Sequence, residues 1–217
     1  MRRVGEEAGE PLEPLFEAVE RHRLNVTHLL TTHADHDHIA GDAEILARYD
    51  CPVVKALACD ADHRGRAGFA GAAVSRDLET GGLEFEAIPT PGHSDDMVAF
   101  VVGDAVFSGD TLFKDAVGGG DFAAIRHVVM DVYMAMPHGR RVLPGHTDET
   151  TIGREWEHNP FVRVWRGEEP EGTEPCRVGG REATLVVWSP DYDGKGKAWV
   201  RFDDGRDAIV GGSRVER

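Results

Sequence analysis

The chain has few cysteines, a shortage of basic residues and no long apolar run, and each scarcity excludes something. Its 217 residues include only Cys51, Cys59 and Cys176, and no two of them have the short spacing of a redox or zinc motif. Reduced thiols in a cytoplasmic protein are therefore expected. The first residues lack the apolar core of a secretory signal, and no apolar run reaches membrane-spanning length, so neither secretion nor membrane insertion is predicted.

Positive charge is the second scarcity. Lys and Arg total 24 against 39 Asp and Glu, which gives a formal net charge of −15. Nucleic acids and anionic membranes select clustered Lys and Arg, so neither is predicted as a partner, although a local basic patch stays open.

What is present indicates a globular, turn-rich protein. Hydrophobic residues make up 41% of the chain and there are 26 glycines, without internal repeats or low-complexity tracts. A chain of this length can bury one moderate core and still carry a small appendage.

The hydrophobic pattern predicts an alternation of helices and strands. Apolar residues recur at helical spacing over 11–22, 42–49, 122–132 and 151–158, with Asp121 as an N-cap. Strands are predicted over 26–31, 52–57, 83–88, 97–102, 105–108 and 141–144, with a hairpin turn at Gly103-Asp104. Residues 60–71 are polar and glycine-rich, which predicts a loop or a short irregular helix.

A polar, acidic, Pro- and Gly-rich stretch divides the chain. We interpret 166–176 as a linker between a domain at 1–165 and a small module at 177–217. Short apolar runs at 183–189, 198–202 and 208–210, separated by Asp-Gly turns, predict that the second module is all-β, of the SH3-like barrel type. Trp188 and Trp199 are expected at its hydrophobic centre.

Four short segments carry the chemistry, because each places His or Asp beside glycine just after a predicted strand. They contain, in order, His33, Asp35, Asp37 and His38; then His93; then Asp110; then His146. Strand ends in a layered sheet structure converge on one rim, so these residues can meet around an ion. Imidazole and carboxylate donors suit zinc, iron or manganese.

The residues divide into two sets. One ion can take His33 and His93, and a second can take Asp37, His38 and His146, with Asp110 bridging the two. Two cations held a few ångströms apart offer a bridging water of lowered pKa.

With these segments in this order, the sequence resembles the metallo-β-lactamase-fold hydrolases over about Gly5 to Phe161. The resemblance is strongest to the glyoxalase II (hydroxyacylglutathione hydrolase) and persulfide dioxygenase branch, through "PTPGHS" at 89–94, "FSGDTLF" at 107–113 and "LPGHTDETTIGREWEHNPF" at 143–161. It implies an α/β fold, the αββα sandwich, with metals at one edge. It also implies two divalent ions as cofactors, with zinc favoured and iron or manganese as alternatives.

Two departures from that family stand out. The family pattern is His-x-His-x-Asp-His, and this sequence has Asp35 at the position of the second His. The carboxylate adds a negative charge and a hard oxygen donor, which shifts the expected metal preference toward iron or manganese. His36 lies one residue out of the ligand register and is expected outside the ligand set. Relatives also open with paired strands before the helix at 11–22, so an upstream start or an open sheet edge is expected, and an open edge leads us to hypothesise a homo-oligomer.

The resemblance implies hydrolysis of a small-molecule thioester by a metal-bridging hydroxide, with Asp37 as the catalytic residue that orients the water while ligating its metal. Two other readings stay open. One is persulfide dioxygenation at a single iron held by His33, His93 and Asp110, and the other is a ligand-sensing or adaptor module with little catalysis. Glutathione-using relatives carry a basic residue in a turn that here reads Gly118-Gly-Gly-Asp121, which weakens the case for glutathione as the thiol.

Overall fold

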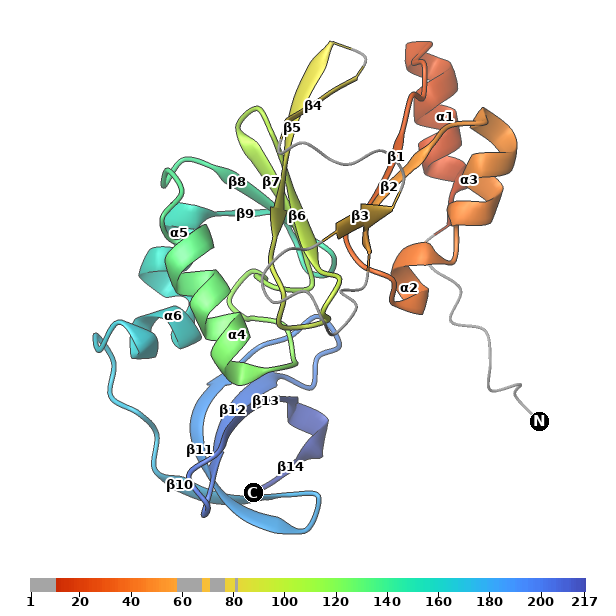
Figure 1. The fold of residues 1–217 in the computed structure, drawn as a ribbon. Coiled ribbons are helices and arrows are strands. Elements are labelled where there is room, and N and C mark those ends of the chain that lie inside the picture. Colours follow the sequence, from red (N-terminus) through yellow and green to blue (C-terminus); the bar gives the residue numbers. More distant parts are fainter. Residues whose placement is uncertain (1–10, 58–67, 71–76, 81) are drawn as a thin grey trace, which may run out of the picture.

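The computed structural model describes residues 11–57, 68–70, 77–80 and 82–217, and Figure 1 shows how their elements are arranged. The described residues form a three-stranded, a six-stranded and a five-stranded sheet. None of the described helices is long and apolar enough to cross a membrane.

The N-terminal part combines a small sheet with three helices. Its sheet has the order β1 (Leu29–Thr31), β2 (Val53–Leu57), β3 (Gly68–Ala70), and its helices are α1 (Glu13–His22), α2 (His36–Ile39) and α3 (Asp42–Tyr49). Helix α1 buries Phe16 and Val19 on the face that its periodicity predicted. Strand β3 corrects part of the loop expected at 60–71, most of which lies outside the described residues.

The six-stranded sheet forms the centre of the molecule. Its strands follow chain order: β4 (Asp77–Thr80), β5 (Leu83–Pro89), β6 (Val98–Val102), β7 (Ala105–Gly109), β8 (Arg141–Pro144) and β9 (Thr150–Thr151). Only β7 and β8 pair in parallel, and all other neighbours in this sheet are antiparallel. The expected turn at Gly103 joins β6 to β7, with Gly103 at φ 57°.

Helices pack on the outer sides of these two sheets. In Figure 1, α1 and α3 flank the three-stranded sheet, and α4 (Phe122–His127), α5 (Ile152–His158) and α6 (Pro160–Trp165) lie on the far side of the six-stranded one. The two sheets thus lie between helical layers. Asp121 caps α4 as expected by accepting a hydrogen bond from the Ala124 amide. The helix then continues as a π-helical turn over Val128–Tyr133, and α6, with Asn159 as its cap, was not predicted.

The C-terminal sheet is antiparallel and has the order β13 (Asp207–Gly211), β12 (Lys197–Phe202), β11 (Arg181–Ser189), β10 (Glu174–Val178), β14 (Val215–Glu216), with a 3₁₀ turn at Gly212–Arg214. One face covers a small core of its own that includes Leu185 and Val200. The other face joins the main core through Val186, Val187, Trp199 and Ile209.

The two tryptophans of this sheet do not form its centre. Trp199 is 4% exposed and packs 4.9 Å from Phe122, between ring centroids, in the main core. Trp188 is 39% exposed. The expectation for both residues was wrong, because the sheet uses its Trp199 face to dock onto the helices of the rest of the chain.

Candidate metal centre

The four sequence segments meet at one edge of the two central sheets. Strands β5, β7 and β8 run in the same direction, so their carboxyl ends lie together. The Val98 amide at the start of β6 donates to the Thr32 carbonyl just after β1, which brings the end of β1 to the same edge. Helix α2, with Asp35 at its N-cap position, follows directly.

His33, Asp35 and His93 form a first group of donors, here called the first triad. Asp35 Oδ2 lies 3.8 Å from His33 Nε2 and 3.1 Å from His93 Nε2. One donor atom from each residue lies within 4.8 Å of the others, close enough for a shared cation. His33 is buried, whereas the Asp35 side chain is half exposed.

Asp37, His38 and His146 form the matching second triad. Asp37 Oδ2 lies 3.7 Å from His38 Nε2 and 3.3 Å from His146 Nε2. These three donors also lie within 4.8 Å of one another. Each triad therefore consists of two histidines and one carboxylate.

Asp110 lies between the triads. Its Oδ1 is 3.3 Å from His38 Nε2, and its Oδ2 is 3.3 Å from His146 Nε2 and 3.8 Å from His93 Nε2. Its carboxylate oxygens thus lie within 3.8 Å of histidines from both triads.

Buried donor atoms without hydrogen-bonding partners show that the site fits cations. Nε2 of His33, Nε2 of His38 and Oδ1 of Asp110 are all buried and make no hydrogen bond, even though the last two lie close together. Leaving a buried polar atom unpaired costs about 1–3 kcal/mol, and coordination to a metal ion would remove that cost. The type of donor atoms and their lack of hydrogen-bonding partners both favour bound metal cations.

A backbone carbonyl and a side-chain hydroxyl contact the Nδ1 atoms of the two histidines in the first triad. His93 Nδ1 lies 2.8 Å from the Gly119 carbonyl oxygen, which can only accept, so Nδ1 donates and Nε2 keeps its lone pair for the site. His33 Nδ1 lies 3.1 Å from Thr32 Oγ1.

Gly145 allows the close approach of the second triad to Asp110. A Cβ at this position would lie 2.3 Å from Asp110 Oδ1 and 2.6 Å from His38 Cε1. Any side chain here would displace one of these two groups, so the close packing around Asp110 requires glycine at position 145.

The electrostatics of the two triads differ. Burial, and then the neighbouring His38, lower the pKa of His33. Interaction with the Asp110 carboxylate raises the pKa of both His38 and His146. Burial alone would raise the pKa of Asp110, but the contacts with His146 and His38 outweigh it and hold that pKa well below its usual range.

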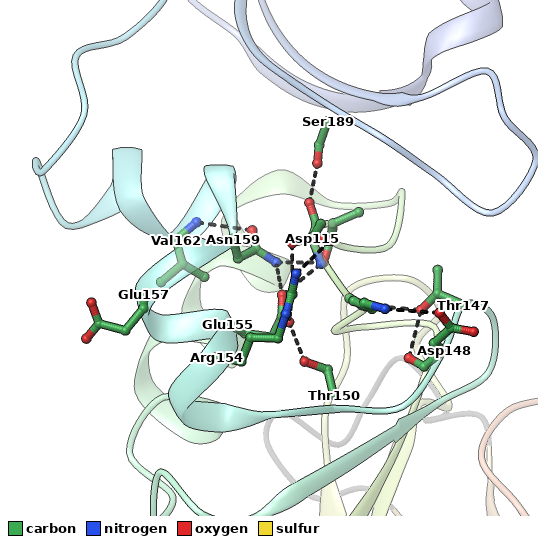
Figure 2. A network of polar contacts seen from close by, with 12 residues as sticks. Asp115, Thr147, Asp148, Thr150, Arg154, Glu155, Glu157, Asn159, Val162 and Ser189 are labelled. Carbon is green, nitrogen blue, oxygen red and sulfur yellow. Dashed lines mark hydrogen bonds and ion pairs between the residues drawn. The ribbon is translucent and has the colours of Figure 1, made fainter.

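A buried polar network supports the loop that follows Asp110, and Figure 2 shows it. The Glu155 carboxylate, 0% exposed, accepts hydrogen bonds from the Asp115 amide at 2.8 Å, Arg154 Nη1 at 2.7 Å, Thr150 Oγ1 at 2.5 Å and Asn159 Nδ2 at 3.0 Å. All of its buried lone pairs are thus used. The network explains part of the "HTDETTIGREWEHNPF" segment as support for this loop.

Some expectations fall outside the site. His36 is exposed and belongs to none of the donor groups among the described residues, as expected. In the loop that follows Asp110, Phe113 is 1% exposed and is a core residue, whereas Lys114 forms an ion pair with Asp148 at 3.0 Å.

Sequence reasoning missed Tyr192. Its ring lies flat against His146, with centroids 4.2 Å apart and an interplanar angle of 14°. It comes from the β11–β12 loop of the C-terminal sheet, and nothing in the local sequence indicates that this loop reaches the site.

Known proteins are similar to this chain in sequence. The chain is 31% identical over 157 residues to the "Probable metallo-hydrolase YqgX" of Bacillus subtilis, covering 62% of this chain and 74% of that protein. It is 38% identical over 112 residues to a hydroxyacylglutathione hydrolase of Rhodopseudomonas palustris, covering 48% of this chain but only 41% of that protein.

Solved structures agree. ETHE1 from Myxococcus xanthus superposes with a TM-score of 0.60 at 27% identity, covering 70% of each chain. TTHA1623 in a di-iron-bound form gives 0.57 at 31% identity, covering 70% of this chain and 86% of that one. The model of the "Metallo-beta-lactamase superfamily" matches residues 4–146. Together with the shared edge of two sheets where the triads meet, this match shows that the chain belongs to the metallo-beta-lactamase superfamily, as a metal-dependent, hydrolase-like member.

Proposed function

We propose that the protein is a thioester hydrolase that holds two divalent cations, one in each triad, with Asp110 between them. The observation that carries the proposal is the pair of matching triads that share a buried carboxylate and leave three buried donor atoms without partners. His33, Asp35, Asp37, His38, His93, Asp110 and His146 are the proposed ligands.

Two cations at such a site supply a water of lowered pKa and a Lewis acid for the substrate carbonyl. Asp37 is the proposed catalytic residue. Its side chain is 51% exposed, so its carboxylate can both reach a cation and accept a hydrogen bond from the attacking water at the open side of the site. A thiolate leaves without a general acid, so the proposed reaction assigns that role to no residue of the site.

The class of substrate rests on the relatives. The similarity to hydroxyacylglutathione hydrolases favours a small thioester, although the alignment spans less than half of their length. The turn over 118–121 offers no cationic side chain for a glutathione carboxylate, so the thiol carrier is proposed to differ from glutathione.

Zinc is the proposed metal, with iron or manganese as alternatives. Asp35 gives the first triad the same composition of two histidines and one carboxylate that Asp37 gives the second. This donor set also suits iron, and the related TTHA1623 structure is of a di-iron-bound form. Elemental analysis of the purified protein, without added metal, decides between them.

The test of the hydrolase proposal is turnover of defined thioesters. The protein is stripped of metal and reloaded with zinc, iron or manganese, and thiol release is followed with S-lactoylglutathione and with acyl thioesters of other small thiols. Metal-dependent release from at least one thioester is the expected result. A protein that binds two ions and yet turns over none of the panel would refute the proposal.

A second candidate function is persulfide dioxygenation, favoured by the similarity to ETHE1. The earlier assignment of its single iron to His33, His93 and Asp110 is less well supported, because those three do not form one of the donor groups whereas Asp35 does group with the two histidines. One iron per chain, together with oxygen uptake on a persulfide, would favour it over hydrolysis.

The remaining expectations are proposals as well. We propose a catalytic domain at 1–165, a linker at 166–176 and a C-terminal module at 177–217 that closes as an SH3-like barrel. The end of the proposed linker overlaps the start of strand β10 (Glu174–Val178), which belongs to the C-terminal sheet. The partner is a small molecule, not nucleic acid or membrane, in a cytoplasmic protein. Strand β1 has a neighbour on one side only among the described residues, which supports a homo-oligomer. Light scattering that gives a monomer at high concentration would count against it.

Poor metal occupancy alongside tight binding of a small molecule or protein would instead indicate the sensing or adaptor role.

A further inference from the structure

The C-terminal sheet reaches the second triad through one side chain. Tyr192 lies parallel to the His146 ring, and Phe113 meets both rings edge-on, with centroids 6.0 Å from His146 and 6.4 Å from Tyr192. The imidazole is therefore held on one face by a phenol and at its flank by a buried phenyl ring. Such aromatic pairs stabilise the arrangement beyond the burial of apolar area.

The loop that carries Tyr192 is itself anchored. Asp191 and Lys197, at its two ends, form an ion pair at 3.0 Å with side chains 3% and 12% exposed. The Tyr192 amide donates to Asp191 Oδ1 at 2.9 Å. Ser189, at the end of β11, donates its hydroxyl hydrogen bond to the Asp115 carbonyl in the loop that follows Asp110 (Figure 2).

The same sheet reaches the first triad through the backbone. Ile209 of β13 forms an antiparallel bridge with Gly120. The neighbouring residue, Gly119, supplies the carbonyl that accepts the hydrogen bond from His93 Nδ1. One sheet thus supports one histidine in each triad, on one side through a stacked side chain and on the other through a backbone contact.

Docking of the sheet does not require Tyr192. The main core already holds the sheet through Val186, Val187, Trp199 and Ile209. Tyr192 lies outside that core and is 56% exposed, an unusual degree for a large aromatic residue. Its contact with a donor histidine is the feature that accounts for its position.

We propose that the C-terminal sheet is part of the metal site and that Tyr192 is a positioning residue that keeps the His146 ring directed at Asp37 and Asp110. The proposal rests on the proposed function, since it assumes that His146 is a ligand. Stacking restrains rotation of the imidazole about its χ2 angle. His146 Nε2 then stays at its 3.3 Å separation from both carboxylates, ready for the ion.

The test is a metal titration of three variants in the full-length protein. Metal-stripped protein is titrated with Zn²⁺ or Co²⁺ against a competing chelator, and the two binding steps are resolved. Tyr192→Ala is expected to weaken one step about 10-fold and leave the other unchanged, because outer-shell contacts of a ligand typically contribute 10–100-fold. Tyr192→Phe keeps the ring and is expected to stay within about twofold of the native protein.

Phe202→Ala is the matched control. Phe202 lies on β12 of the same sheet, packs against that sheet's own small core and is covered by the Arg181 guanidinium 4.1 Å from its ring centroid. Its removal is expected to lower the melting temperature without changing either metal-binding step. A loss of metal affinity in this control equal to that in Tyr192→Ala would show a general effect of destabilisation and overturn the proposal.

A double-mutant cycle identifies the histidine involved. Tyr192→Ala should have no further effect on metal affinity when combined with His146→Ala, and should keep its full effect when combined with His93→Ala. Native-like titration of Tyr192→Ala would refute the positioning role while leaving the hydrolase proposal intact. Failure of the native protein to bind two ions would instead refute the proposed function itself.

Discussion

The two triads have the same composition and different surroundings. Each has two histidines and one half-exposed aspartate, Asp35 in the first triad and Asp37 in the second. The first triad is set by burial of His33 and by the Gly119 carbonyl behind His93. The second triad is set by the charge of Asp110 and by an aromatic side chain from a distant sheet.

Two sites with the same donor residues can therefore differ in their electrostatics. Burial lowers the pKa of His33, whereas Asp110 raises the pKa of His38 and His146. Protons therefore compete more strongly for the second triad than for His33. The backbone holds one triad and packing holds the other, so they should respond differently to mutation and pH.

Removing the shared carboxylate of Asp110 should weaken both triads and so have the largest effect. Asp110→Asn takes the bridging charge from both triads, and we expect thioesterase activity to fall about 10³-fold, since metal-linked stabilisation of the transition state is worth several kcal/mol. The measurement is kcat/KM with metal content determined in parallel. Asp104→Asn, in the exposed β6–β7 turn, is the control, and comparable turnover in the two variants would contradict the site.

Crowding the site at Gly145 should break the second triad selectively. A methyl group there meets Asp110 and His38, so we expect Gly145→Ala to weaken the ion of the second triad about 100-fold, as for loss of support to a ligand. Gly139→Ala is the matched control, because a Cβ at Gly139 has nothing within 4 Å. Equal metal affinity in both variants would argue against close packing around Asp110.

Replacing Asp35 with histidine, the residue of the family pattern, should make the two triads differ in their metal preference. Asp35→His removes a hard oxygen donor from the first triad only, and we expect the ratio of zinc to iron bound to rise roughly tenfold. Elemental analysis after growth with both metals measures this ratio. An unchanged ratio would show that Asp35 does not contact the ion.

Lowering the pH should have the smallest effect, a difference between the two triads in their affinity for metal. His38 and His146 have raised pKa values, so they take up protons at a higher pH than His33, whose pKa is lowered. As the pH falls, we expect the ion of the second triad to leave first, with a few-fold difference in relative affinity. Metal content after dialysis at stepwise lower pH measures this, and simultaneous loss of both ions would contradict it.

In the metal-free protein, the same pKa shifts have the opposite consequence for stability as the pH falls. Raised pKa values of His38 and His146 contribute stability that is fully present below the unfolded value of 6.5 and is lost as pH rises through the folded values. Metal-free protein should therefore gain stability on mild acidification from these two groups, while the metal-loaded protein loses it.

Much of the central fold could be predicted from local sequence. The Gly103-Asp104 turn, the Asp121 cap and the apolar spacing of 11–22 each depend on neighbours along the chain, and each lies where expected. Helix α6 was missed because its six residues follow α5 with only Asn159 between them, too short a stretch for periodicity to detect. Trp199 was assigned to the wrong core because a buried strand residue does not record which partner covers it.

The sequence by itself determined the set of donors, because residue type and position at a strand end are local properties. Only the tertiary structure decided that Asp35 groups with His33 and His93, which of the donors are buried, and that Tyr192 covers His146. Those features depend on two sheets meeting at one edge and on a third sheet docking through Trp199, contacts between segments far apart in the chain whose geometry no local pattern encodes.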